Sequence, residues 1–96
     1  MAVIGMTIHA VEATAQKALN AQNKVTEAVI RAVRDQGVED RHIHNEAPSV
    51  KPAGAKSYRA SLKLSVTTST QEQAAAVIPA AVEAGGDAVQ IDEADA

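Results

Sequence analysis

The sequence predicts a small α+β domain with ferredoxin-like β-α-β-β-α-β order, in which two helices cover one face of a four-stranded antiparallel sheet. Three observations predict this fold class. Apolar and polar residues alternate along two long segments, as in strands with one packed and one solvated face. Two other segments carry an apolar stripe at helical spacing, and glycine follows each of them. The length of 96 residues suits a single domain, which we assign to residues 1–96.

Residues 3–36 predict the first strand and the first helix. Apolar and other side chains alternate over residues 3–11, which indicates a strand. Thr14 can cap a helix that runs to about Gln36, and Gly37 supplies the stop. One apolar stripe of this helix should face the sheet, and it comprises Ala15, Ala18, Leu19, Val25, Val29, Ala32 and Val33.

The middle of the chain predicts two strands joined by a loop. We expect a strand from residue 41 to about residue 47, which Pro48 ends or places at an edge. Residues 49–57 contain proline and glycine and are typical of a hairpin loop. Residues 58–67 alternate most clearly of all, so they should form a central strand.

The last third of the chain predicts a helix and a short strand. Ser69 and Glu72 have the spacing of a capping box, which opens a helix that ends at the Gly85–Gly86 pair. A strand over residues 88–92 follows. We expect the acidic tail, residues 92–96, to fray.

Composition limits the classes of function. With 46% hydrophobic and 22% charged residues the chain should fold, and its core must be thin because Tyr58 is its only aromatic residue. A net charge of −3 and the lack of aromatic stacking residues argue against a nucleic-acid partner. The absence of cysteine excludes disulfides and thiolate chemistry. No apolar run approaches a membrane span, so we expect no membrane insertion.

Right-handed crossovers should place the first and third strands at the centre of the sheet and both helices on one face. The opposite face is then left open. Side chains point alternately to the two faces along a strand, and we call the resulting odd or even position of a residue its parity. Parity assigns all three histidines and three charged residues to this open face: His9, His42, His44, Glu46, Arg59 and Lys63. These six residues are the candidates for ligand binding or for an interface.

Four stretches of the chain carry a family resemblance: residues 10–15 between strand and helix, residues 23–43, the strand start Tyr58-Arg59-Ala60-Ser61-Leu62 with its continuation to Val66, and residues 80–86. Together they resemble the SIMPL-domain family, whose members are mostly bacterial and often periplasmic. The resemblance implies no catalytic motif. It implies assembly, since some members look like ring- or channel-shaped homo-oligomers.

The chain is a short, truncated version of the family pattern. It lacks the usual signal peptide, the leading strand segment, and the helix and strand that follow the last strand in typical members. As written it carries no export signal, so we expect a cytoplasmic location, or a periplasmic or secreted one if these residues are an excised mature domain.

The open face has three interpretations. His42 and His44 lie two apart on one predicted strand and could bind a transition metal with Glu46 as third ligand, although Arg59 and Lys63 on the neighbouring strand would disfavour a cation. Alternatively, the face packs against a second copy or holds an anionic ligand. In the third interpretation these residues only solvate an exposed sheet.

No phosphate-binding loop and no arrangement indicative of a serine nucleophile is found in the sequence. We therefore expect no enzyme activity and no cofactor. The leading hypothesis is a non-enzymatic, self-assembling SIMPL-like module that forms a homo-oligomer. The alternative is a small metal- or anion-binding domain that uses the open sheet face.

Overall fold

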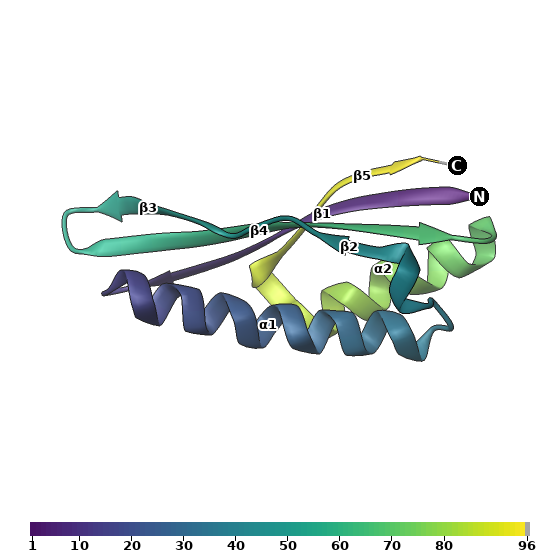
Figure 1. The fold of residues 1–96 in the computed structure, drawn as a ribbon, viewed down its shortest axis with the longest axis horizontal. Helices are drawn as coiled ribbons and strands as arrows, with labels where there is room; N and C mark the ends of the chain where they lie inside the picture. Colours follow the sequence, from purple (N-terminus) through teal and green to yellow (C-terminus); the bar gives the residue numbers. More distant parts are fainter. Residues whose placement is uncertain (96) are drawn as a thin grey trace.

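The computed structural model describes residues 1–95, which form two layers: an antiparallel sheet, and two α-helices that both lie against one of its faces (Figure 1). The molecule is elongated, 44 × 21 × 21 Å. Along the chain the elements are β1 (Ala2–Glu12), α1 (Ala15–Asp35), the 3-10 helix η1 (Asp40–His42), β2 (Ile43–Asn45), β3 (Ser49–Gly54), β4 (Ser57–Thr68), α2 (Gln71–Gly85), the 3-10 helix η2 (Gly86–Ala88) and β5 (Val89–Asp95).

The sheet has the order β2-β4-β1-β5, and β3 also pairs with β4. The two longest strands, β1 and β4, thus lie at the centre, as predicted for the first and third strands. The predicted number of four strands is wrong, because the sheet has five. β2 and β3 lie on the same edge of β4, where residues 46–48 separate them. Pro48 has no N–H for the ladder, which favours a break at this point.

The segment around residues 41–57 differs most from prediction. The expected strand over residues 41–47 shrinks to β2, and His42 lies in η1, outside the sheet. The expected hairpin loop over residues 49–57 is largely β3, which pairs with the first half of β4 and forms a long hairpin with it. An edge strand tolerates proline and glycine, because its outer N–H groups face solvent. The proline and glycine that indicated a loop are therefore compatible with a strand at this edge.

Both helices begin at a side-chain cap. The Thr14 Oγ1 accepts a hydrogen bond of 3.1 Å from the Lys17 N–H, which confirms the predicted cap of α1. The capping box predicted for α2 is wrong by one residue. Thr70 is the cap and accepts from the Gln73 N–H at 3.0 Å, while Gln73 Oε1 accepts from the Ser69 N–H at 2.9 Å.

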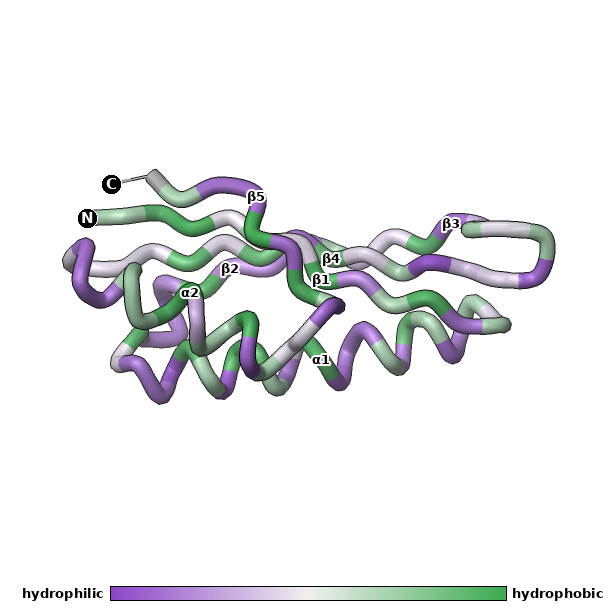
Figure 2. Tube along the Cα trace, turned by 180° about the vertical axis from the view of Figure 1, so that it is seen from behind, coloured by the Kyte–Doolittle hydropathy of each residue, from purple (hydrophilic) through white to green (hydrophobic). Residues whose placement is uncertain are grey.

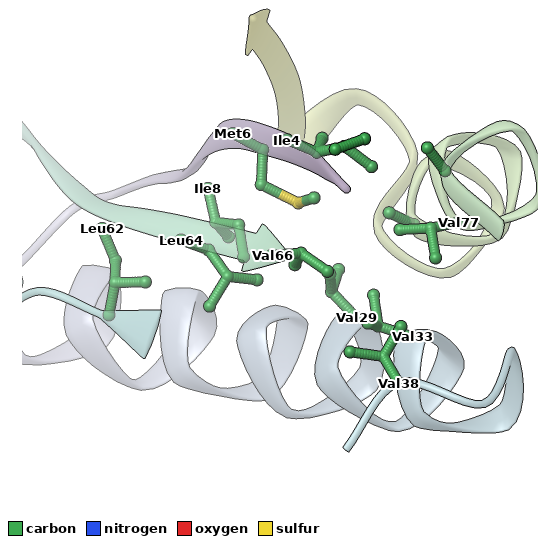
Figure 3. Packing of buried hydrophobic residues seen from close by; sticks show 13 residues of the cluster. Ile4, Met6, Ile8, Val29, Val33, Val38, Leu62, Leu64, Val66 and Val77 are labelled. Carbon is green, nitrogen blue, oxygen red and sulfur yellow. The ribbon is translucent and has the colours of Figure 1, made fainter. Parts of the chain in front are cut away.

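The core lies between the sheet and the helices and is built from aliphatic side chains (Figure 3). Its fully buried members include Ile4, Met6, Ile8, Leu64, Val66, Val29, Val33 and Val77. The buried side of α1 also carries two polar residues, Gln22 and Thr26, which the predicted apolar stripe omitted. Thr26 donates to the Gln22 carbonyl at 2.9 Å, and the Gln22 Nε2 donates to the Thr26 hydroxyl. These contacts give the Thr26 hydroxyl and the Gln22 amide nitrogen partners, which offsets part of the cost of burying the two side chains.

The two helices cover the sheet unequally. α1 runs along most of its length, whereas α2 lies only under the half that holds the chain termini (Figure 1). The β3–β4 hairpin at the other end is covered by α1 alone. Tyr58 lies there opposite Glu12 and is 38% exposed.

The chain ends in a strand that is longer than predicted. β5 runs to Asp95 and pairs with β1 across a bulge, whereas a frayed tail was expected over residues 92–96. Ala96, the last residue of that expectation, lies outside the described residues. Within residues 1–95, neither helix has the length and hydrophobicity that a membrane span requires.

Candidate functional site: the open face of the sheet

The open face is the side of the sheet that the helices leave bare. Side chains alternate along a strand, and the even-numbered residues over 2–8 of β1 and 60–68 of β4 are buried against the helices, so the odd-numbered ones lie on the open face. They form rows across the two central strands: Gly5 with Ser65, Thr7 with Lys63, His9 with Ser61, and Val11 with Arg59. β2 and β3 extend these rows on one side, and β5 extends them on the other.

A hollow of about 440 Å³, here called the basic depression, occupies the hairpin half of this face. Lys51 of β3 lies directly opposite Arg59 of β4, and Lys63 lies further along β4 on the same face. Like charges in directly opposed positions destabilise a sheet. Among the side chains that the structure describes, none of these three cations forms an ion pair, since the two ion pairs found are Arg34–Asp40 and Arg41–Glu39. The depression therefore holds three uncompensated cations.

Hydroxyl and imidazole groups line the floor of the basic depression. His9 Nδ1 and Ser61 Oγ are hydrogen-bonded at 3.0 Å. Ser49 of β3 lies opposite Ser61 on the next strand and lines the same hollow. A single carboxylate, that of Glu46, lines it beside Lys63. Positive charge and hydrogen-bond donors thus dominate its surface.

The other half of the open face carries an acidic end, formed by Asp92 and Glu93 of β5. Figure 2 shows the hydrophilic stretch of β5 beside the N-terminus. Asp92 is the extra residue of the bulge, and its carboxylate accepts hydrogen bonds from the Thr7 hydroxyl at 2.5 Å and from the Gln90 amide at 2.9 Å. Glu93 is paired with Gly5, and its side chain lies close above the Gly5 backbone. The open face is therefore basic towards the hairpin and acidic towards the termini.

Five of the six predicted site residues line hollows on this face. His9 and Arg59 line the basic depression, and Glu46 and Lys63 line both it and a second hollow of about 500 Å³. His44 lines the second hollow, together with Asp92 and Glu93. His42 is the exception, because η1 removes it from the strand whose parity was used to place it.

The suggested metal set of His42, His44 and Glu46 is not assembled by the fold. Within the described part of the chain, no group of three His, Cys, Asp or Glu side chains is arranged to hold a metal ion. The reason is local: His42 belongs to a 3-10 turn, so it does not project from the sheet in register with His44.

Sequence reasoning missed four groups that shape this face: Lys51, Ser49, Asp92 and Glu93. Lys51 and Ser49 were missed because their segment looked like a loop. Their alternation with Val50, which is half-buried, was the available signal for a strand. The two acidic residues were assigned to a frayed tail, and nothing local in the sequence indicates the bulge that orients them.

The whole chain matches one family model. That model is described as SIMPL, a protein of unknown function (DUF541), and it matches residues 1–95. The chain belongs to the SIMPL family. This confirms the resemblance drawn from residues 10–15, 23–43, 58–66 and 80–86. Comparison with curated proteins gives no match to this SIMPL domain.

Solved structures with a similar fold include two of AtUAH, one in complex with glyoxylate and one in complex with (S)-hydroxyglycine. The SIMPL domain superposes on the first with a TM-score of 0.68 at 13% identity, and on the second with a TM-score of 0.62 at 14% identity. Each alignment covers 98% of this chain but only 27% and 26% of AtUAH. The SIMPL domain thus spans about a quarter of that protein, and at this identity the likeness is one of fold.

Proposed function

We propose that this SIMPL domain is a non-enzymatic self-assembly module whose open face binds the same face of a second copy. The observation that carries the proposal is the opposite charge at the two ends of that face. Lys51 and Arg59 make the hairpin end basic, and Asp92 and Glu93 make the other end acidic. A symmetric dimer uses the same surface on both subunits, so such a surface must be complementary to itself.

A two-fold axis provides that complementarity. If it lies between two open faces and runs across the strands, it exchanges the two ends, so that the basic end of one copy lies over the acidic end of the other. Arg59 is six residues along β4 from Ser65, which is paired with Gly5. An axis near Leu62, halfway between them, would bring Arg59 over Ser65 of the second copy. The Glu93 carboxylate of that copy lies over Gly5, one strand or about 4.8 Å to the side, a distance that an arginine side chain can span to form an ion pair. Stacked sheets about 10 Å apart leave room for this ion pair.

The area of the open face is suitable for a dimer. The strands of the sheet hold 39 residues, and each covers about 16 Å², since residues are about 3.4 Å apart along a strand and strands are about 4.8 Å apart. The resulting area of about 640 Å² is of the same order as the roughly 800 Å² per partner of a specific interface.

The sheet edges suit self-association less well than the face does. β3 carries Lys51 and Pro52, both of which hinder the addition of another strand. On the opposite edge, β5 is interrupted by the bulge at Asp92 and is acidic beyond it. Pairing of two β5 edges would bring like charges together, which is unfavourable.

When β2 and β3 are counted as one interrupted edge strand, the sheet also takes the four-strand, ferredoxin-like order in which one face stays open.

The absence of catalysis is part of the proposal. His9 and Ser61 are within hydrogen-bond distance, as a base and a nucleophile would be. Among the described residues, however, His9 has no hydrogen bond to a carboxylate that could orient its ring. A Ser–His pair without that third group lacks the arrangement of known acyl-transfer sites.

Sedimentation equilibrium at low ionic strength, from 1 to 500 μM protein, tests the proposal. The wild-type chain should form a dimer that weakens in 0.5 M NaCl, because salt screens exposed charges. Arg59→Glu and Glu93→Lys should each weaken the dimer at least tenfold, and the double variant should restore it. Arg31→Glu on the outer side of α1 is the matched control and should have no effect. A monomer throughout the range, or no restoration in the double variant, would refute the proposal.

A further inference from the structure

We infer that the basic depression is a binding site for a small, doubly charged oxyanion, namely the phosphate group of a small monoester. The site is formed within one copy of the chain, so the inference goes beyond the proposed assembly and does not require it. Because both use Arg59, phosphate and the second copy should compete for this face.

The first argument is charge. Lys51 and Arg59 face each other across β3 and β4, and Lys63 lies on the same face further along β4. Among the described side chains none of the three has an ion-pair partner, although the chain as a whole carries a net charge of −3. Their mutual repulsion costs stability. A bound anion between them would remove that repulsion, so this arrangement of cations favours anion binding.

The second argument is the set of donors. The planar guanidinium of Arg59 can donate two parallel hydrogen bonds to one phosphate group. Ser49 and Ser61 lie opposite each other on adjacent strands, so their hydroxyl groups lie close together at the floor of the hollow. The hydrogen bond between Ser61 and His9 holds the Ser61 side chain in place. Lysine, arginine and hydroxyl groups therefore converge from two strands.

The third argument is charge balance, which selects the class of anion. Three cations and the single carboxylate of Glu46 leave about two positive charges in the basic depression. A phosphate monoester carries about −1.5 to −2 at neutral pH. It matches that charge, whereas a monocarboxylate or chloride neutralises only about half of it.

The fourth argument is the shape of the hollow. Its volume of about 440 Å³ lies within the range of small-molecule sites. Ala47, Pro52 and Ala53 form an apolar wall along the β3 edge of the hollow. This wall can contact an apolar substituent on the phosphate, so a monoester with a small apolar body should bind more tightly than inorganic phosphate.

Titration of the ¹⁵N-labelled full chain, followed by NMR at constant ionic strength, tests the inference with inorganic phosphate and phenyl phosphate as probes. We expect saturable shifts of the backbone amides of Ser49, Lys51, Arg59 and Ser61, with phenyl phosphate binding several-fold more tightly. Arg59→Ala and Lys51→Ala should each weaken binding at least tenfold. Arg59→Lys should weaken it less, since it keeps the charge and loses only the paired hydrogen bonds.

Arg31→Ala, which removes the same group from the outer side of α1, is the matched control and should leave the affinity unchanged. Equal weakening by Arg31→Ala, shifts that do not saturate, or equal shifts with chloride would each overturn the inference. The same titration in the Glu93→Lys variant separates it from the proposed assembly. Phosphate binding that persists there without a dimer supports this site alone, and a dimer without phosphate binding refutes this site alone.

Discussion

The Glu93 side chain lies over the backbone of Gly5, its partner across β1 and β5. A Cβ atom on Gly5 would be 3.1 Å from Cγ and 3.2 Å from Oε1 of Glu93. Glycine at this position therefore lets a carboxylate lie over a central strand of the open face. The acidic end thus extends inward from the sheet edge, towards the position where the proposed dimer needs it.

Gly5→Ala should displace the Glu93 side chain and weaken the dimer several-fold. The obstructed atoms belong to a flexible exposed side chain, so the free energy of unfolding should change by less than about 1 kcal/mol. Sedimentation equilibrium and urea unfolding measure the two effects separately. Ser65→Ala, in the same row on β4, is the control and should affect neither. A variant dimer as stable as the wild type would show that the position of Glu93 is unimportant.

Gly85→Ala should lower the free energy of unfolding by about 1–3 kcal/mol, as overpacking does. A Cβ at this position would overlap Val89 Cγ2 and press on Val29 and Val25. Val89→Ala should recover part of this loss when combined with Gly85→Ala, which urea unfolding of the single and double variants can measure.

Gly86→Ala provides a contrast to Gly85→Ala, because Gly86 has open space around it but a positive φ of 56°. With ψ at −136° the backbone of Gly86 lies outside the left-handed helical region, so Gly86→Ala should lower the free energy of unfolding by about 1–3 kcal/mol through backbone strain. Val89→Ala should therefore give it no recovery. Equal recovery of both glycine variants would mean that the close contact between α2 and β5 is not the cause.

Gln22→Met should raise the free energy of unfolding by about 1 kcal/mol. The Gln22 side chain is fully buried, and among residues 1–95 its Oε1 atom finds no hydrogen-bond partner. An unsatisfied buried acceptor costs about 1–3 kcal/mol, and methionine has a similar length without it. Thr26 keeps its own bond to the backbone carbonyl of residue 22. Thermal unfolding should show a higher midpoint, with the exposed Gln16→Met as control, and an unchanged or lower midpoint would contradict this account.

Thr70→Ala should destabilise the protein by about 1 kcal/mol, the usual cost of losing a helix cap. Ser69→Ala should cost almost nothing, because Ser69 contributes its backbone N–H and not its hydroxyl. Urea unfolding of the two variants distinguishes the capping register of the structure from the one that the sequence indicated. The reverse order of stabilities would favour Ser69 as the cap.

Much of the fold was predictable because its signals are local. The alternation along β1 and β4 and the cap at Thr14 depend on neighbours in the chain, and the structure confirms them. The error at α2 has a local cause too, since Ser69 and Thr70 are both good caps and only the packing of the helix selects one of them.

The candidate site was only partly predictable. Parity placed His9, Arg59 and Lys63 correctly, because these residues lie within long, regular strands. It failed for His42, whose segment turns into η1, and it missed Lys51, whose strand is interrupted by Pro48. Assigning side chains to a face by parity fails wherever a strand is short or bulged, since one extra residue moves every later side chain of the strand to the opposite face.

The sequence alone determined the class of this protein: an α+β domain with two helices on one side of an antiparallel sheet, in a chain that resembles the SIMPL family. Periodicity and capping suffice for the fold class, because they act over a few residues. Only the tertiary structure decided how the open face is charged. The opposition of Lys51 to Arg59 and the position of Glu93 over Gly5 join residues distant in the chain, and they depend on strand register and on one bulge. Register is a property of paired strands, so no single segment could reveal it.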